Sequence, residues 1–432
     1  LFYRLGDFYE MFFEDALTAS RELEITLTGK NCGQEERAPM CGVPYHAVEG
    51  YLNRLVAKGY KVAICEQVED PKQAKGIVKR EVVRIVTPGT NLDTQALDET
   101  KNNYIMCIVY IADRYGVSIA DISTGDYFVT ELPDGSRLMD EIYKFSPSEI
   151  ICNENFTISG IDIADLKERM QISIAKLDAH YFDDRLAVAV LLEHFHTSRL
   201  SALGLEEFPM GSISAGALMK YLIEIQKSSL EQFNHVQPYL NGNFMLLDSS
   251  TRRNLELVET LREKQKRGSL LWVLDKTKTA MGARMLRSDV EQPLTNADLI
   301  TDRLDAVDEL LHNMMAREEL REYLNPIYDL ERLNTRIVYQ TANPRDLLAF
   351  KNSVAMLPAI KTVLADFKSK NLVELSENID SLSDICADID AAICEEPPIS
   401  SRDGGILKDG YNEEVDRLRK AKTEGKKWLA EL

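Results

Sequence analysis

The sequence is poor in the features that stabilise secreted or zinc-bound domains. Its 432 residues include only seven cysteines, and no two of them form a C-x-x-C pair. A scattered, odd set of cysteines supports neither a disulfide framework nor a zinc ribbon, and it favours a reducing cytoplasm. No run of about 18 apolar residues occurs, so we expect no membrane span. The sequence therefore predicts a cytoplasmic protein.

Net positive charge is also lacking. The formal net charge is −19, whereas proteins that bind nucleic acid usually carry a basic patch. Basic residues nevertheless gather in two strips, residues 72–84 and 262–287. The first strip holds Lys72, Lys75, Lys79, Arg80 and Arg84, and the second holds Arg262, Lys264, Lys266, Arg267, Lys276, Lys278, Arg284 and Arg287. Each strip fits either a solvated charged face or a surface that grips phosphate.

Signatures of catalysis are missing as well. The Gly-Lys pairs in "TGKN" and "EGKKW" lack the upstream glycine and the following Ser or Thr of a phosphate-binding loop. Asp121, in "VSIADISTGDYFVTEL", resembles a magnesium-binding strand aspartate, but two-metal chemistry needs several converging carboxylates. We therefore expect no catalytic residue, no metal and no cofactor in this chain.

The length predicts two to four domains. Residues 1–90 alternate strand and helix signals, as in the strand-like "LFYRL", the helix "YLNRLVAKG" closed by Gly59, and the strands "YKVAICEQV" and "EVVRIVTPGT". Residues 91–100 are polar and fit a linker. Next come three β-rich runs, separated by Gly116 and Gly125, which predict an antiparallel meander. Helical patterns such as "RLMDEIYKF" and "DDRLAVAVLLEHFH" follow it.

From about residue 245 onward the pattern is almost wholly helical. Ser249, Ser250 and Thr251 are candidate N-caps, and prolines punctuate the later helices. The chain starts at Leu1 within a strand-like segment and ends in the helical "KKWLAEL". We therefore expect a part of a longer protein.

The stretch "GDFYEMFFED", residues 6–15, has two interpretations. Asp7 and Glu10 have the D-x-x-E spacing of a capping box, and Phe8 then extends the apolar stripe of a helix. Alternatively, Phe8 projects into solvent and inserts between DNA bases, which costs a few kcal/mol of unstacking per step. Stacking on a base returns about 1–3 kcal/mol, so insertion favours a mispaired or unpaired base. A protonated Glu10 could then donate a hydrogen bond to a ring nitrogen.

Several blocks together resemble one family. "GDFYE" is similar to the Phe-x-Glu motif of the MutS family of DNA mismatch-repair proteins, and "APMCGVPYHAVEGYLNRLVAKGYKVAICEQVEDP" and "KREVVRIVTPGT" resemble its mismatch-recognition domain. The blocks "LDSSTRRNLEL", "GARMLRSDVEQPL", "TANPRDL" and "RDGGILKDGYNEEVDRL" resemble its core or lever segments. The resemblance covers nearly the whole chain in the expected order.

The resemblance implies a multidomain α/β plus all-α fold. Its parts would be a mixed α/β mismatch-recognition domain at 1–92, a ribonuclease-H-like α/β connector at 93–230, a helical core/lever domain at 231–415, and the start of a clamp helix at 416–432. The full-length parent would be a homodimer that binds mismatched double-stranded DNA and a MutL-type repair protein. Its ATPase domain, with ATP and magnesium, would lie beyond Leu432.

The resemblance also implies five DNA-binding residues. Phe8 matches the stacking phenylalanine and Glu10 the base-contacting glutamate. Arg80 aligns with a basic residue near the mismatch, Lys30 with a backbone contact, and Met40 with a loop that lines the minor groove. The alternative is a non-enzymatic, helical protein-interaction scaffold in which Phe8 is buried in the core.

Overall fold

The structure is a computed structural model that describes residues 1–31, 33, 36–69, 76, 78–93, 96–240, 244–399 and 403–431. The chain divides into two compact units. Unit 1 comprises residues 1–273 and 290–292, and unit 2 comprises residues 274–289 and 293–432. Lys72, Lys75 and Cys32 lie outside the described residues, and the six described cysteines are free.

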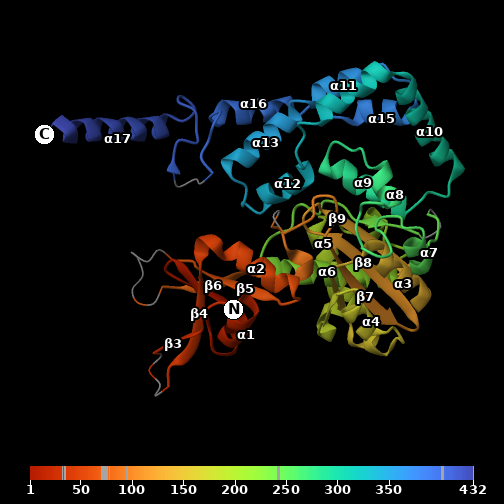
Figure 1. The fold of residues 1–432 in the computed structure, drawn as a ribbon, viewed down its shortest axis with the longest axis horizontal. Coiled ribbons are helices and arrows are strands. Elements are labelled where there is room, and N and C mark those ends of the chain that lie inside the picture. The colour runs from red at the N-terminus through yellow and green to blue at the C-terminus, as the bar shows by residue number, and fades with distance from the viewer. Residues whose placement is uncertain are drawn as a thin grey trace. The chain divides into compact units, whose positions relative to one another are not determined.

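Unit 1 begins with a mixed sheet of six strands in the order β3-β4-β2-β1-β5-β6, drawn in red and orange in Figure 1. Strands β1 and β2 form an antiparallel hairpin, and β1 runs parallel to β5. The strands are β1 (Phe2–Leu5), β2 (Phe8–Phe12), β3 (Thr28–Lys30), β4 (Ala38–Pro44), β5 (Val62–Gln67) and β6 (Arg80–Val86). The strands predicted in "LFYRL", "YKVAICEQV" and "EVVRIVTPGT" are thus confirmed.

Two helices bury the core face of this sheet. Helix α1 (Phe13–Leu23) contributes Ala16, Ala19 and Leu23 to a cluster that also includes Leu52 of α2 (Val48–Ala57). Gly59 follows α2 with a φ of +86°, as its predicted role in ending the helix requires.

The capping-box interpretation of Asp7 and Glu10 is wrong. Residues 8–12 form strand β2, which pairs with β1 on one side and β4 on the other. The helix begins only at Phe13, after a strand-to-helix corner where Phe13 has a φ of +51°. Hydrogen bonding to two neighbouring strands outweighs the local helix-start signal. Phe8 therefore belongs to a strand and does not extend the apolar stripe of a helix.

A second six-stranded sheet follows, in the order β11-β10-β7-β8-β9-β12. Strands β7, β8 and β9 form the predicted antiparallel meander, and β10 runs parallel to β7. The strands are β7 (Tyr104–Ile111), β8 (Arg114–Asp121), β9 (Asp126–Leu132), β10 (Glu149–Cys152), β11 (Ser173–Lys176) and β12 (Gln237–Pro238).

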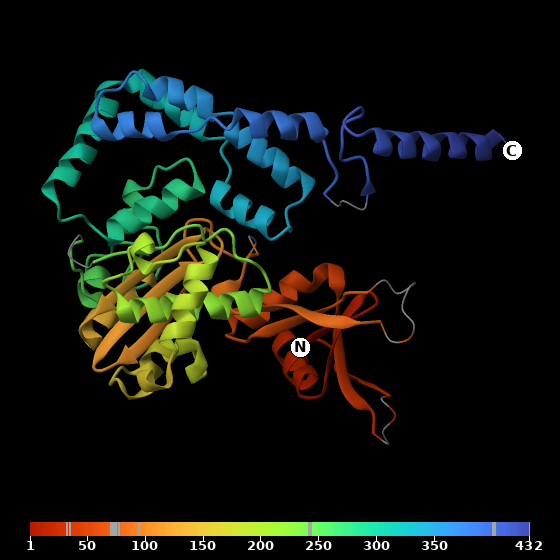
Figure 2. The ribbon, with the colours of Figure 1, turned by 180° about the vertical axis from the view of Figure 1, so that it is seen from behind.

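Helices cover both faces of the second sheet (Figure 2). On one face Ile119 belongs to the same hydrophobic cluster as Ile142 of α3 (Gly135–Phe145) and Leu166 of α4 (Ile163–Glu168). On the other face Ser118 Oγ lies 2.9 Å from Ser214 Oγ of α6 (Pro209–Gln226). Helix α5 (Asp184–His194) packs on α6. The result is an α/β domain with a covered sheet.

Two glycines of this domain allow close packing. Gly216 of α6 lies so near α5 that a Cβ atom there would stand 2.1 Å from the carbonyl oxygen of Ala187. Gly116, predicted to separate two strands, instead lies within β8, where a Cβ would stand 2.2 Å from the carbonyl oxygen of Met210. Ala112 and Asp113, both with positive φ, make that turn. Gly125 turns the chain between β8 and β9 as predicted.

From residue 249 onward the regular elements that the structure describes are helices, as predicted, apart from one β-bridge between Ile393 and Leu407. The helices are α7 (Ser249–Asn254), α8 (Leu270–Leu274), α9 (Ala280–Glu291), α10 (Ala297–His312), α11 (Met314–Leu324), α12 (Leu330–Val338), α13 (Pro344–Val354), α14 (Leu357–Leu364), α15 (Lys370–Asn378), α16 (Ser383–Ala392) and α17 (Glu413–Glu431). A core cluster of unit 2 contains Ala306, Leu320, Ile327, Ile360, Leu364, Phe367 and Leu372.

The start of helix α7 differs from the sequence prediction. The N-cap of α7 is Asp248, whose carboxylate accepts from the Thr251 amide at 2.7 Å, and not one of the three hydroxyl residues that follow it. In "TANPRDL", Asn343 and Asp346 form a capping box around Pro344, which occupies the first turn of α13.

One segment, Pro344–Leu364, is long and apolar enough to cross a membrane by length and composition. It consists of two helices, α13 and α14, separated at Ala355–Met356, and Ile360 and Leu364 lie in the core of unit 2. Lys351 of this segment also pairs with Asp390. We therefore interpret it as core helices of a globular unit.

The fold class is thus confirmed as multidomain α/β plus all-α, with two mixed or partly parallel sheets followed by helices. The domain boundaries at 92, 230 and 415 stay predictions. The structure joins both sheets within unit 1.

Candidate nucleic-acid interface

The first sheet has one face that neither α1 nor α2 covers. Side chains of a strand alternate between faces, and in β2 Tyr9 and Met11 are buried in the core whereas Phe8, Glu10 and Phe12 point the other way. The strand register places Tyr3 opposite Glu10, Met40 opposite Phe12, and Arg80 opposite Gln67. We call this surface the open face, defined by Tyr3, Phe8, Glu10, Phe12, Thr28, Lys30, Met40, Gly42 and Arg80.

Phe8 stands at the edge of a tight turn. It follows Gly6 and Asp7, which connect β1 to β2, and Gly6 has a φ of +59°. The Phe8 side chain remains 46% exposed. Burial of Phe8 in the core, on which the scaffold alternative depends, is therefore contradicted.

Gly42 opens the surface beside Phe8. It pairs with Glu10 across β2 and β4. A Cβ at Gly42 would contact Glu10 Cγ at 3.6 Å and Phe8 Cδ1 at 3.7 Å. The absence of a side chain at Gly42 keeps the surface between the phenyl ring and the carboxylate free of a further side chain.

Glu10 is held by Lys30. Lys30 Nζ lies 2.6 Å from Glu10 Oε2, and the two side chains are 41% and 17% exposed respectively. The ammonium also lies 5.5 Å from the centre of the Phe12 ring. Because the pair is partly solvated, it contributes modestly to stability, but it fixes the carboxylate two residues from Phe8.

The strand itself is anchored from the core side by Tyr9. Its hydroxyl donates a hydrogen bond to Glu66, and its ring lies near Phe2 and the Arg4 guanidinium. Burial first, and then the hydrogen bond to Glu66, raise the pKa of Tyr9 to about 12. Tyr9 therefore stays a neutral donor, and it keeps Phe8 and Glu10 directed away from the core.

The other predicted site residues lie on the same face, with one correction. Met40 belongs to strand β4 and not to a loop, and it is held between Thr28 of β3 and Phe12 of β2. Thr28 donates a hydrogen bond to the Met40 carbonyl at 3.0 Å. Lys30 ends edge strand β3. The structure thus brings all five predicted residues onto one face.

Arg80 is bound to main-chain oxygens. Its Nε donates to the Arg4 carbonyl at 2.7 Å and its Nη1 to the Val78 carbonyl at 2.9 Å. Its guanidinium carbon lies 5.3 Å from the centre of the Tyr3 ring. Arg80 therefore connects the start of β6 to the end of β1.

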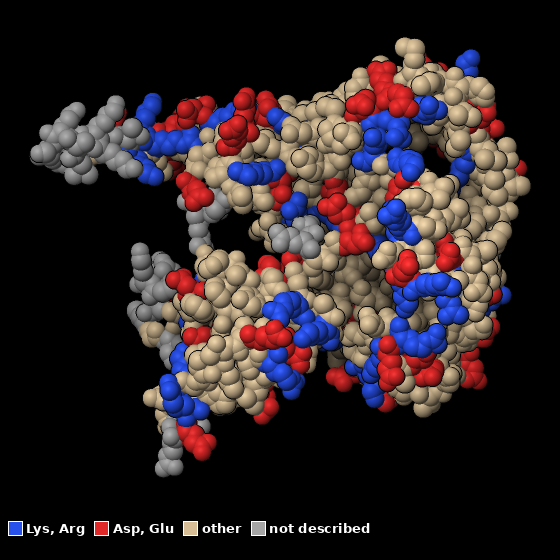
Figure 3. Space-filling view, viewed as in Figure 1, with Lys and Arg blue, Asp and Glu red and all other residues tan. Residues whose placement is uncertain are grey.

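The charged surface is mixed. Lys79 pairs with Glu81 and Arg84 with Glu49 in the first basic strip, and in the second strip Arg284 is buried and paired with Asp329. On the side drawn in Figure 3, Lys and Arg are interspersed with Asp and Glu. Ion pairing thus accounts for part of both strips.

Sequence reasoning missed a buried glutamate where the two sheets meet. Glu149 of β10 is completely buried. Lys61 Nζ lies 2.9 Å and Tyr221 OH 3.0 Å from its Oε1, and the Thr87 hydroxyl donates to its Oε2. We call Lys61, Thr87, Glu149 and Tyr221 the Glu149 junction. Only its position in a buried strand, "PSEII", could have drawn attention to it.

The junction admits no extra atoms. A Cβ at Gly89 would stand 2.8 Å from Ile105 Cβ and 3.0 Å from Glu149 Cβ. The glycine of "TPGT" therefore allows the segment after β6 to lie directly against the second sheet. The junction connects the open-face sheet, through β6, with strand β10 and helix α6.

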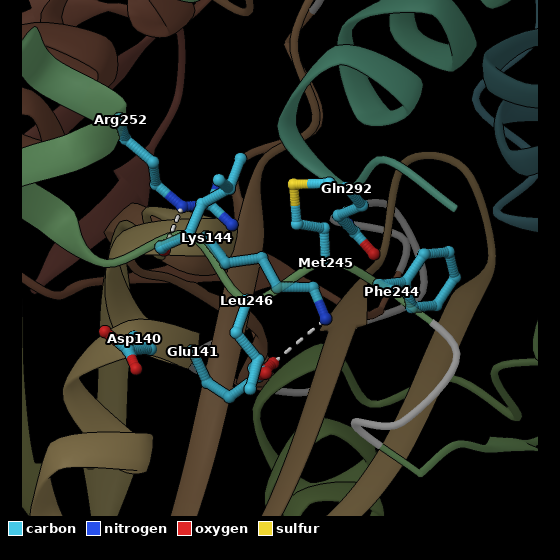
Figure 4. Close-up of a pocket in the computed structure, with 9 residues that line it drawn as sticks. Asp140, Glu141, Lys144, Phe244, Met245, Leu246, Arg252 and Gln292 are labelled. Atoms are coloured by element: carbon cyan, nitrogen blue, oxygen red, sulfur yellow. Dashed lines mark hydrogen bonds and ion pairs between the residues drawn. The ribbon is translucent and has the colours of Figure 1, made fainter. Parts of the chain in front are cut away.

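A small pocket of unit 1, between α3 and residues 244–252, is lined by charged and apolar residues (Figure 4). Lys144 is 3.1 Å from Glu141, and Arg252 Nε donates to the Leu247 carbonyl at 2.9 Å. Burial lowers the pKa of Lys144. Lys144 and Arg252 each have one partner within the pocket (Figure 4), and Arg252 Nη1 is buried without a hydrogen-bond partner among the described residues. We interpret the pocket as structural.

Asp121, the candidate metal ligand, has a structural role. It is buried and accepts from the Asn103 amide at 2.9 Å, the Ser123 amide at 2.8 Å and the Ser123 hydroxyl at 2.7 Å. Among the residues that the structure describes, no group of three or more His, Cys, Asp or Glu side chains could hold a metal ion.

The fold and the open face define a class: a multidomain protein that begins with an α/β domain presenting an exposed aromatic beside a carboxylate. Family models for MutS domain I, MutS domain II and MutS domain III match residues 1–95, 103–237 and 250–431. The chain belongs to the MutS family.

Relatives named "DNA mismatch repair protein MutS" match over the whole of this chain. The relative from Lachnoclostridium phytofermentans is 62% identical over 432 residues, which cover 100% of this chain and 46% of the relative. Those from Ruminiclostridium cellulolyticum and Acetivibrio thermocellus are 50% and 49% identical, again over 100% of this chain and 50% of each relative. The chain thus spans about half the length of these relatives.

Proposed function

We propose that this chain recognises mismatched double-stranded DNA, with Phe8 inserting at a mispaired or unpaired base and Glu10 hydrogen-bonding that base. The observation that carries the proposal is the exposed Phe8 ring on the open face, beside Glu10 and the bare backbone of Gly42. The names of the relatives support the substrate class.

The energetics favour damaged sites. Wedging a side chain between paired bases costs a few kcal/mol per step, and stacking returns about 1–3 kcal/mol. The two terms nearly cancel in a perfect duplex, so a step that is already unstacked tips the balance. The wedge therefore reads deformability, and Glu10 adds selectivity by binding a base edge.

Binding DNA would require the charged pair of Glu10 and Lys30 to exchange partners. Glu10 is neutralised by Lys30 in the free protein, at 2.6 Å. A carboxylate near phosphates is repelled, and a neutral carboxyl group can donate to a ring nitrogen. Lys30, released from Glu10, can then bind the DNA backbone, and Met40 lines the groove next to Phe12.

The whole protein would supply the remaining parts. We propose that it acts in the cytoplasm as a homodimer, binds a MutL-type protein, and couples mismatch binding to ATP and magnesium through a domain outside this chain. The Glu149 junction offers a route by which a change in the first domain reaches the second.

The test is a binding assay with the full-length protein. Equilibrium affinities for a G·T duplex, an unpaired-T duplex and a matched homoduplex would be measured for Phe8→Ala and for a matched control, Leu17→Ala. Leu17 is exposed on α1 and lies off the open face. We expect Phe8→Ala to abolish mismatch preference without changing the melting temperature, and Leu17→Ala to retain that preference. Equal preference in both variants would refute the proposal.

A further inference from the structure

The contacts of Arg80 differ from those expected of a side chain that is free to bind a DNA phosphate. Two of the five N–H groups of an arginine are committed to main-chain carbonyls of Arg4 and Val78, at 2.7 and 2.9 Å. The guanidinium also lies over the Tyr3 ring, and the residue is only partly exposed. Planar donors held at fixed carbonyls give an oriented, rigid connection.

Strand pairing explains why this connection is needed. Strands β1 and β5 pair at Phe2 with Ile64 and at Tyr3 with Cys65, and their pairing ends there. Arg80, at the start of β6, pairs with Gln67 at the end of β5. The Arg80 side chain therefore reaches from edge strand β6 to the carbonyl of Arg4. Arg4 lies near the end of β1, beyond the residues that pair with β5.

The end of β1 leads directly to Phe8. Arg4 pairs with Tyr9 and Leu5 with Phe8, and only Gly6 and Asp7 lie between. The Arg4 side chain in turn donates from Nε to the Gly6 carbonyl. Arg80 thus holds the main chain at Arg4, Arg4 holds the turn at Gly6, and the turn sets the direction of Phe8.

We propose that Arg80 is a positioning residue for Phe8. By holding the β1–β2 turn through the Arg4 carbonyl, Arg80 sets the direction of Phe8 and so contributes to mismatch selectivity. This inference rests on the proposed function of Phe8. It assigns to Arg80 a role in selectivity that a general phosphate contact does not have.

The two roles predict different results in one experiment. The full-length variants Arg80→Lys and Arg80→Met would be compared on a G·T duplex and a homoduplex over a range of salt concentrations. Lysine keeps the charge but cannot reproduce the two-carbonyl geometry. The control is Arg84→Lys, on the same strand, where Arg84 instead pairs with Glu49 of α2 at 2.7 Å.

If Arg80 positions Phe8, both Arg80 variants lower the ratio of mismatch to homoduplex affinity by about tenfold, the equivalent of one lost charge-assisted hydrogen bond. Homoduplex affinity and its salt dependence stay unchanged in Arg80→Lys, and Arg84→Lys retains the wild-type ratio. If instead Arg80→Lys keeps that ratio while Arg80→Met weakens both duplexes equally and reduces the salt slope by about 1, Arg80 is a phosphate contact and the inference is wrong.

A measurement without DNA separates this inference from the proposed function. Amide hydrogen exchange at residues 4–9 of the free protein should be faster in both Arg80 variants, while exchange in α2 stays at the wild-type rate. Unchanged exchange at the turn would overturn the inference even if the variants bind poorly. If wild-type protein shows no mismatch preference, the proposed function fails, and the exchange result still decides whether Arg80 holds the turn.

Discussion

The Glu149 junction yields a quantitative prediction for the variant Lys61→Met. Glu149 is completely buried, and Lys61 pairs with its carboxylate, with Nζ 2.9 Å from Oε1. Removing one partner of a buried ion pair costs about 3–5 kcal/mol. Two features reduce this value: Lys61 is 37% exposed, and the hydroxyls of Thr87 and Tyr221 still donate to the carboxylate.

We therefore expect Lys61→Met to lower the free energy of unfolding by about 2 kcal/mol, after a discount for solvent screening. Glu149→Gln removes the charge and keeps the shape, and hydroxyls can rotate to accept from an amide, so its cost should be about 1 kcal/mol. Because the neutral amide introduced by Glu149→Gln no longer needs a cation, the double variant should be more stable than the sum of the single effects predicts.

The assay is urea unfolding followed by circular dichroism, with amide hydrogen exchange at residues 85–90 and 149–152 as a local readout. The control is Lys58→Met, which removes a partly exposed pair with Glu22 of α1 and a hydrogen bond to the Glu22 carbonyl, and which should cost clearly less than Lys61→Met. Equal effects of Lys61→Met and Lys58→Met, with unchanged exchange at the junction, would refute the assignment of Glu149 as a buried, cation-dependent group.

Two further predictions concern the packing of α6 against α5 and the buried hydroxyl of Tyr9. Gly216→Ala should destabilise the second domain by about 1–3 kcal/mol, since a Cβ would lie 2.1 Å from the Ala187 carbonyl oxygen. The control is Gly50→Ala in α2, where nothing lies within 4 Å of the new Cβ, and it should leave the melting temperature unchanged or raise it. Tyr9→Phe should alter alkaline unfolding: the folded pKa of Tyr9 is raised from 10.0 to about 12, so the neutral hydroxyl contributes stability that is present below pH 10 and lost as the pH rises toward about 12. A pH titration of stability should therefore fall less steeply in Tyr9→Phe over that window, and identical slopes would contradict the buried Tyr9 hydroxyl.

Much of the fold follows from local patterns. Strands β1, β5 and β6, the meander and the end of α2 at Gly59 were predictable because their periodicity and turn residues agree with the tertiary structure. Strand β2 was not predictable in this way. "DFYE" carries a helix-start spacing, and only pairing with β1 and β4, the latter about 30 residues away, makes it a strand.

The candidate site, like the fold, is predictable from the sequence only in part. The resemblance pointed to the five site residues, and the structure adds how they are held: Lys30 against Glu10, Arg80 at the Arg4 carbonyl, Met40 in a strand. These contacts join residues that are distant in sequence. Glu149 lay beyond sequence reasoning for the same reason, since Tyr221 is 72 residues away from it.

The most direct test of the central claim is a photo-crosslink from position 8. Full-length protein carrying p-azidophenylalanine in place of Phe8 would be irradiated with a duplex that holds a single G·T pair and with the matched homoduplex, and the crosslinked nucleotide would be mapped. We predict a crosslink to the mispaired base or its immediate neighbour, and little or none to the homoduplex. A crosslink spread equally over both duplexes, or its absence while mismatch binding persists, would contradict the claim that the side chain at position 8 enters the DNA.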